Sequence, residues 1–205
     1  MDPARDPIVT ECDLKRERLV REKLTEFAES LENNLRLIKN LLSSEQPNVD
    51  QILMRSIRYE LLTRSCPDAT PYPEDLVEEV KSECVEEIVR RLRSVGTLVS
   101  DTVEAFNRIL RSFQAVEKAA YRCDWAQRSE LIEGSKVRQP LDVYLYRGYS
   151  IGNQLQLMTV ELMETFNGID AKKAGTIEKF KGCLKIPEDF EKYVVEFVQE
   201  QKILE

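Results

Sequence analysis

The chain contains no histidine among its 205 residues. Histidine is the commonest general base, the usual partner of a catalytic serine or cysteine, and the commonest nitrogen ligand of zinc and iron. The phosphate-binding and nucleophile motifs GxxxxGK[ST], GxGxxG, HExxH and GxSxG are missing as well. These absences disfavour enzymatic catalysis, and we expect neither a metal nor a cofactor.

Long apolar runs are also missing. No window approaches the roughly 20 uninterrupted apolar residues that a membrane span requires. The first twelve residues carry Asp2, Arg5, Asp6 and Glu11, where a signal peptide would be apolar. The five cysteines show no CxxC spacing, which fits reduced thiols. We therefore expect a soluble intracellular protein, cytoplasmic or nuclear, without membrane contact.

Positive charge is in the minority, because the formal net charge is -7. A nucleic acid would meet a repulsive surface on average, so we expect protein partners and no nucleic acid. The densest basic cluster, Arg90-Arg91-Leu92-Arg93, could contact phosphate or an acidic partner. The cationic last turn of a helix explains the same cluster, and that interpretation is favoured.

A few other groups invite a chemical interpretation. The pairs Glu86 with Glu87 and Glu161 with Glu164 have the spacing of a solvated helix face. Because the chain has no histidine that could activate it, Cys123 is interpreted as a packed thiol. Three tyrosines between residues 144 and 149 could form a stacking platform or pack between helices.

The apolar residues that are present recur at steps of three and four, which is typical of amphipathic helices. This periodicity predicts helices near residues 13–42, 48–65, 74–95, 101–133 and 141–169, and a last one from Pro187. Breaks are expected at residues 43–47, at Gly96 and at Gly134, with a distortion at residues 150–152.

These elements predict an all-α protein: a four-helix bundle of long antiparallel helices with a C-terminal accessory helix. Residues 1–12 form an irregular arm, residues 13–181 the bundle, and residues 182–205 the accessory helix and tail. Three prolines between residues 65 and 74 mark an exposed linker inside the bundle.

The stretch from Gly96 to Lys181 reads as two long amphipathic helices separated by a break before Pro140. Its other distinctive positions are Trp125, Arg128, Leu131, Leu155-Gln156-Leu157, Glu161-Leu162, Phe166, Ile169 and Ile177-Glu178-Lys179-Phe180-Lys181. In this pattern the chain resembles the last two helices of the REG (11S) proteasome activators. The similarity covers about 86 of the 205 residues.

The resemblance implies a four-helix protomer that assembles into a heptameric ring, binds the proteasome core particle and opens its gate without ATP. It assigns partner binding to the C-terminal Ile203, Leu204 and Glu205, and it implies that the family's activation loop corresponds to Arg91, Arg93, Ser94, Val95 and Gly96. This segment lacks the family's proline, its acidic and asparagine run, and its length. Residues 186–205 also extend beyond the family's last helix, either as a docking tail or as an extra packing helix.

A second function fits the same features. The long apolar stripe of residues 13–42 could pair with another chain, as in a coiled coil. The protein would then be a helical subunit of a hetero-oligomeric scaffold, of the kinetochore or vesicle-tethering type. Both hypotheses describe a non-enzymatic protein that functions by assembly, the first as a homo-oligomer and the second with different chains.

Overall fold

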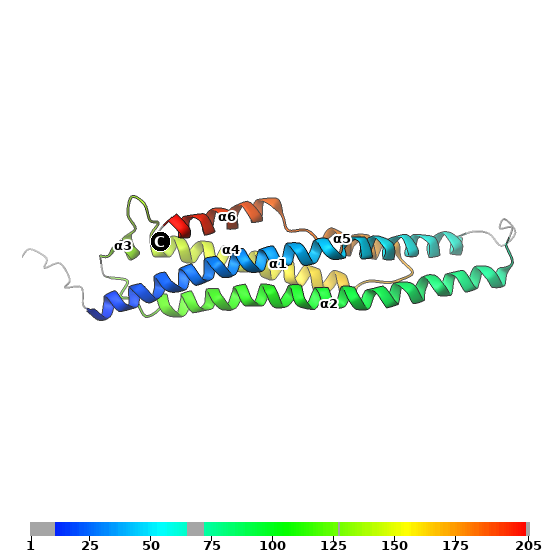
Figure 1. The fold of residues 1–205 in the computed structure, drawn as a ribbon, viewed down its shortest axis with the longest axis horizontal. Helices are drawn as coiled ribbons and strands as arrows, with labels where there is room; N and C mark the ends of the chain where they lie inside the picture. Colours follow the sequence, from blue (N-terminus) through cyan, green and yellow to red (C-terminus); the bar gives the residue numbers. More distant parts are fainter. Residues whose placement is uncertain (1–10, 65–71, 127, 204–205) are drawn as a thin grey trace, which may run out of the picture. The chain divides into compact units, whose positions relative to one another are not determined.

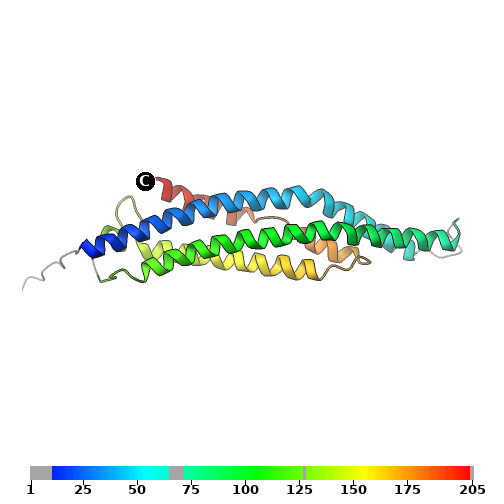
Figure 2. The same cartoon turned by 60° about the horizontal axis from the view of Figure 1, so that its bottom comes forward.

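The structure, a computed structural model, describes residues 11–64, 72–126 and 128–203. These residues form six α-helices and no strand, which confirms the predicted all-α class. Helices α1 and α2 form a long antiparallel pair that packs with α4 (Figures 1 and 2). The helices are α1 (Glu11–Arg64), α2 (Glu74–Ala120), α3 (Glu130–Glu133), α4 (Leu141–Asn167), α5 (Ala174–Gly182) and α6 (Glu188–Ile203).

Helix α1 is continuous, so the break predicted at residues 43–47 is wrong. Pro47 lies inside the helix. Leu42 and Val49, one on each side of it and two helical turns apart, are both buried. Burying two such side chains contributes about 3–6 kcal/mol, which outweighs the roughly 3 kcal/mol that an interior proline costs.

Helix α2 is also continuous, and the stop predicted at Gly96 is wrong. Gly96 serves close packing instead, because a Cβ atom there would lie 3.3 Å from Cζ of Phe166. A glycine can mark either a helix end or a place where a neighbouring side chain packs closely on the backbone. Gly96 marks such close packing, by Phe166.

The helices that follow Gly96 have other boundaries in the structure than the sequence predicted. Helix α2 ends at Ala120 instead of continuing to Glu133, and the four residues of α3 precede Gly134. Gly134 has φ 80° and caps α3, so a helix does end at this glycine, but it is the short α3 and not the long helix predicted at residues 101–133. Helix α4 runs without interruption through residues 150–152, and α5 is a separate helix.

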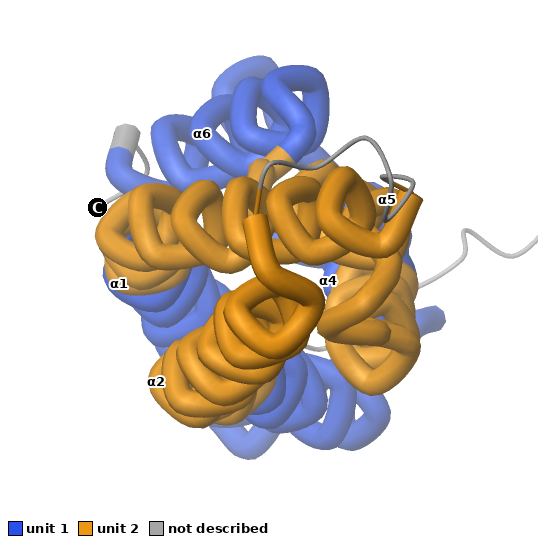
Figure 3. Tube along the Cα trace, turned by 90° about the vertical axis from the view of Figure 1, so that its right-hand side faces the viewer, with its two compact units in different colours: residues 1–36, 106–156, 187–205 blue, residues 37–105, 157–186 orange. Residues whose placement is uncertain are grey.

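The chain divides into two compact units, which Figure 3 distinguishes by colour. Unit 1 comprises residues 1–36, 106–156 and 187–205, and unit 2 comprises residues 37–105 and 157–186. Each unit contains a segment of α1, a segment of α2 and a segment of α4. The fourth helix is α6 in unit 1 and α5 in unit 2.

The core of unit 1 is aromatic. The ring of Phe27 on α1 lies 5.1 Å from that of Phe113 on α2 and 5.5 Å from that of Phe197 on α6. Phe197 also meets Tyr144 of α4 edge to face. Of the three tyrosines between residues 144 and 149, Tyr144 is buried in this core, whereas the side chain of Tyr146 is exposed.

The core of unit 2 is mainly aliphatic, with one aromatic pair. Phe166 and Phe180 lie 5.6 Å apart between ring centroids. Around them, buried side chains come from all four helical segments: Leu42, Val49 and Ile52 from α1, Ile88 and Val95 from α2, Leu162 from α4, and Ile177 from α5.

Two predicted segments fall largely outside the described residues. Of the N-terminal arm at residues 1–12, only Glu11 and Cys12 are described, and both belong to α1. Of the linker at residues 65–74, Tyr72 and Pro73 are described and exposed, and Glu74 begins α2. No helix within the described ranges is both long enough and apolar enough to cross a lipid bilayer.

Candidate functional site

The segment that the resemblance assigned to a gate loop lies in the middle of α2. Residues 91–96 are helical throughout, so they form no loop. Val95 is fully buried, whereas Arg93 and Ser94 are exposed. The interpretation of Arg90 to Arg93 as the last turn of a helix is also wrong, because α2 continues to Ala120.

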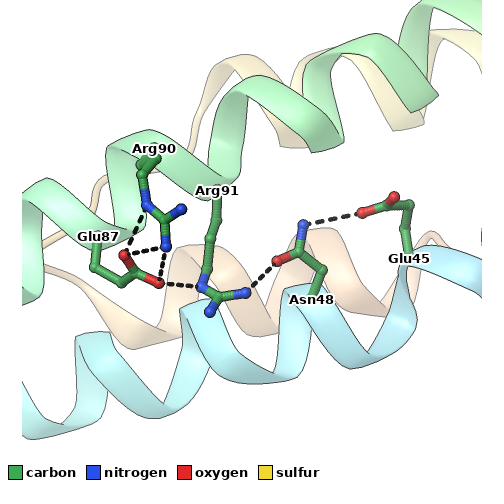
Figure 4. Close-up of polar contacts among 5 residues, drawn as sticks. All are labelled: Glu45, Asn48, Glu87, Arg90 and Arg91. Carbon is green, nitrogen blue, oxygen red and sulfur yellow. Dashed lines mark hydrogen bonds and ion pairs between the residues drawn. The ribbon is translucent and has the colours of Figure 1, made fainter.

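Instead, two arginines of this segment converge on one carboxylate. Arg90 donates from Nε and Nη2 to the carboxylate of Glu87, with distances of 2.6 to 2.9 Å. Arg91 donates from Nε to Oε1 of Glu87 at 2.6 Å. Spacings of three and four residues place all three side chains on one face of α2 (Figure 4).

Arg91 also connects α2 to α1. Its Nη1 donates to Oδ1 of Asn48 at 2.8 Å, and Nδ2 of Asn48 donates to Oε2 of Glu45 at 3.0 Å. The hydroxyl of Ser94 lies 3.4 Å from Oε1 of Glu45 and adds a second, weaker connection. Figure 4 shows this chain of contacts from Glu87 through Arg91 to Glu45, which we call the α1–α2 polar cluster.

The charge state of the cluster follows from these contacts. Hydrogen bonds from Arg90, with further bonds from Arg91 and the charges of both guanidinium groups, lower the pKa of Glu87 below its ordinary value of 4.5. Glu87 is therefore a carboxylate at neutral pH and holds no proton to donate. The cluster therefore joins two helices through an ionised carboxylate.

A surface pocket of about 370 Å³ lies beside the cluster. It is lined by Arg55 of α1 and by Glu83, Glu86, Glu87 and Arg90 of α2. The arginines offset much of the carboxylate charge at this place. Within the described ranges, no group of three or more Cys, Asp or Glu side chains has a geometry that could hold a metal ion.

The other predicted partner-binding residues lie at the end of the chain. Ile203 is the last residue of α6, and Leu204 and Glu205 fall outside the described residues. Residues 188–203 form a packed helix, in which Phe197 is fully buried. Glu200 of this helix pairs with Arg147 of α4, and Lys202 pairs with Glu32 of α1. Of the two alternatives for this extension, the packing helix is confirmed for α6.

The surroundings of Cys123 and Cys183 make these two thiols less reactive than a free cysteine. Burial raises the pKa of the Cys123 thiol, and burial also raises that of Cys183. A raised pKa leaves less thiolate at neutral pH, so these two are poor nucleophiles. Cys66 lies outside the described residues.

Sequence reasoning missed the part of the cluster contributed by α1. The sequence predicted a break at residues 43–47 and a new helix from residue 48, but Asn48 lies inside α1 and bridges to Arg91. These residues are 43 positions apart, and no local spacing relates them. Only the arginine and glutamate spacing within α2 was visible in the sequence.

With this geometry in hand, we compared the chain with protein-family models, with curated proteins and with solved structures, and none of the three comparisons gave a match.

Proposed function

We propose that this chain is a non-enzymatic subunit of an intracellular hetero-oligomeric assembly, built on a four-helix bundle with α6 as an accessory helix. The observation that carries the proposal is an exposed apolar patch on α4 in unit 2. Leu157, Val160 and Met163 are 64%, 52% and 44% exposed and follow one another at steps of three residues. We call these three residues the α4 patch.

The charges around the α4 patch indicate the kind of partner. Between Gly148 and Ala171 the sequence contains no lysine or arginine, and Glu161 and Glu164 are exposed beside the patch. A second copy of the same patch would bring these carboxylates together, which is unfavourable. An amphipathic helix with an apolar stripe and basic flanking residues complements both the apolar surface and the charge.

The proposal can be tested with a defined probe. A fluorescent synthetic helix with one leucine stripe flanked by lysines should bind the chain, and a scrambled peptide of the same composition should bind at least tenfold more weakly in an anisotropy titration. Leu157→Glu and Val160→Glu should each weaken binding of the amphipathic helix by at least tenfold. Val195→Glu, at an exposed apolar position of α6, is the matched control and should leave binding unchanged.

Two outcomes would contradict the proposal. Equal binding of the scrambled peptide would mean that charge alone attracts the probe. An equal effect of Val195→Glu would mean that the α4 patch has no special role. Far-ultraviolet circular dichroism of each variant shows whether its helices are retained.

The homo-oligomeric proteasome activator of the REG type is the second candidate. The matches at Glu161-Leu162 and at residues 177–181 favour it. However, Leu162, Ile177 and Phe180 are buried core residues of unit 2, so packing within this chain accounts for them. The helical conformation of residues 91–96 further weighs against gate opening. Purified chain that raised hydrolysis of short fluorogenic peptides by the proteasome core particle would favour this candidate over the first.

A further inference from the structure

Three arginines surround a pocket in unit 1, which contains neither the α1–α2 polar cluster nor the α4 patch. A pocket of about 580 Å³ is lined by Arg18 and Arg21 of α1, by Arg138 of the segment before α4, and by Gln201 of α6. Small-molecule sites have volumes of about 300–1,000 Å³, so the pocket has the size of a ligand site.

The pocket is positively charged in a chain of net charge -7. Three guanidinium groups line it, against one carboxylate, that of Glu22. The carboxylate of Glu22 is already 3.6 Å from Nζ of Lys23. Arg21 has one further acidic neighbour, Glu130, whose Oε2 lies 3.9 Å from Nη2 of Arg21. Positive charge therefore exceeds negative charge at the pocket, and an anion would balance it.

A buried amide points to the same conclusion. Gln201 is only 7% exposed, and its Nε2 is buried without a hydrogen-bond partner of good geometry in the described part of the chain. Burial raises the pKa of the nearby Tyr144 hydroxyl, and a contact from the Gln201 side chain acts in the opposite direction. A buried donor without a partner is unfavourable, and an oxygen of a bound ligand would satisfy it.

The remaining wall of the pocket is apolar. Leu131 and Tyr144 line it, and both side chains are almost fully buried. Arginine forks bind phosphate and carboxylate oxygens, and a phosphate monoester carries about 1.5 to 2 negative charges at pH 7. A phosphate monoester would balance the excess charge better than a single carboxylate does, and its organic part could lie against the apolar wall.

We propose that the unit 1 pocket binds a small organic phosphate monoester, with Arg18, Arg21 and Arg138 around the phosphate and Gln201 donating from Nε2 to a ligand oxygen. The pocket is a binding site in this proposal, and no reaction takes place there.

Isothermal titration calorimetry with phenyl phosphate tests the proposal on the full chain at low ionic strength. Phenyl phosphate should bind in a one-to-one ratio and at least tenfold more tightly than inorganic phosphate or benzoate. Arg18→Gln and Arg21→Gln should each weaken binding at least tenfold. Arg93→Gln removes the same charge at an exposed position of unit 2, so it is the matched control and should change the affinity less than twofold.

A further variant separates ligand binding from structure. Gln201→Leu removes the unsatisfied amide and keeps a side chain of similar size, so the unliganded chain should be at least as stable to urea while phenyl phosphate binds more weakly. Loss of stability together with unchanged affinity would show that the amide is structural and would overturn its assigned role. Absence of phenyl phosphate binding at millimolar concentration would overturn the whole proposal, as would equal binding of benzoate or an equal effect of Arg93→Gln.

Discussion

At the scale of single residues, Gly148 is the glycine of α4 that leaves less room for a side chain than Gly152 does. A Cβ atom there would lie 2.0 Å from Cε2 of Phe113. Phe113 cannot retreat easily, because its ring is packed against both Phe27 and Tyr149. The glycine is therefore required by the approach of an aromatic ring, and its backbone lies in a regular helix.

We predict that Gly148→Ala destabilises the protein. Overpacking costs about 1–3 kcal/mol or more, and the higher helix propensity of alanine returns about 1 kcal/mol. A Cβ only 2.0 Å from a ring atom places the cost at the upper end of this range, so the free energy of unfolding in urea should fall by about 2 kcal/mol. Gly175→Ala in α5 is the control: no neighbouring atom lies within 4 Å of a Cβ there, so this variant should be equally stable or more stable than the wild type. Equal behaviour of the two variants would contradict the packing of Phe113 on Gly148.

Glu87 gives a prediction about pH. Its pKa is lower in the folded chain than the ordinary value of 4.5, because Arg90 and Arg91 bind the carboxylate. A carboxylate with a lowered folded pKa stabilises the protein fully above its unfolded pKa and loses this contribution as pH falls through the folded pKa. Glu87→Gln should therefore lower the urea midpoint at pH 7, and the difference from wild type should shrink as pH is lowered below 4.5.

The neighbouring Glu86 is the control for this prediction. It is exposed, and it lies on the same turn of α2. Glu86→Gln makes the same change of charge, so a difference from wild type of the same size and pH dependence would show that overall charge, and not the contacts of Glu87, causes the effect.

At the scale of helices, the apolar stripes were predictable and the breaks were not. In the helix predicted at residues 13–42, the apolar stripe from Val20 to Leu42 is buried within this chain, because residues at steps of three and four share a helix face. The stripe is therefore not free to pair with another chain, contrary to what the hetero-oligomer hypothesis expected from the sequence. In contrast, Pro47 and Gly96 were read as helix ends from their local effects on the backbone. Local costs alone did not decide the structure: burial of Leu42 and Val49 holds the helix together around Pro47, and close packing of Phe166 accounts for Gly96.

The candidate sites show the same limit. Contacts between residues three and four apart, such as Glu87 with Arg90 and Arg91, could be inferred from spacing. The contact of Arg91 with Asn48 could not, because it joins residues 43 positions apart. The pocket of unit 1 likewise gathers residues from α1, the segment before α4, and α6, and no motif relates Arg21, Arg138 and Gln201 in the sequence.

Pro47 provides a test of the continuous α1. It removes one backbone donor inside a helix that the surrounding core holds together, so Pro47→Ala should raise the free energy of unfolding by about 1–3 kcal/mol. The measurement is urea unfolding followed by circular dichroism at 222 nm. Gln51→Ala, one turn further along and also exposed, is the control and should change stability by less than about 0.5 kcal/mol. A loss of stability in Pro47→Ala would instead favour the broken helix that the sequence suggested.

At the scale of the whole molecule, the two proposed functions predict different masses in solution. The REG-like hypothesis requires a ring of identical chains, whereas the hetero-oligomer proposal leaves the isolated chain without its partner. The carboxylates of Glu161 and Glu164 lie beside the α4 patch, in a stretch without lysine or arginine from Gly148 to Ala171, and they oppose pairing of two copies. Light scattering should therefore give the mass of a single chain at micromolar concentration and physiological ionic strength.

The role of charge in keeping copies apart can be tested directly. The double variant Glu161→Lys, Glu164→Lys places basic residues beside the apolar α4 patch, so wild-type and variant patches become complementary. A mixture of wild type and double variant should form a dimer that light scattering detects, and its affinity should fall as salt rises because the attraction is screened. Adding Leu157→Glu to the double variant should abolish this dimer, because the apolar contact is lost although both introduced lysines remain. A wild-type chain that already forms a ring at physiological ionic strength, unchanged by Leu157→Glu, would instead place the assembly surface elsewhere and favour the homo-oligomeric hypothesis.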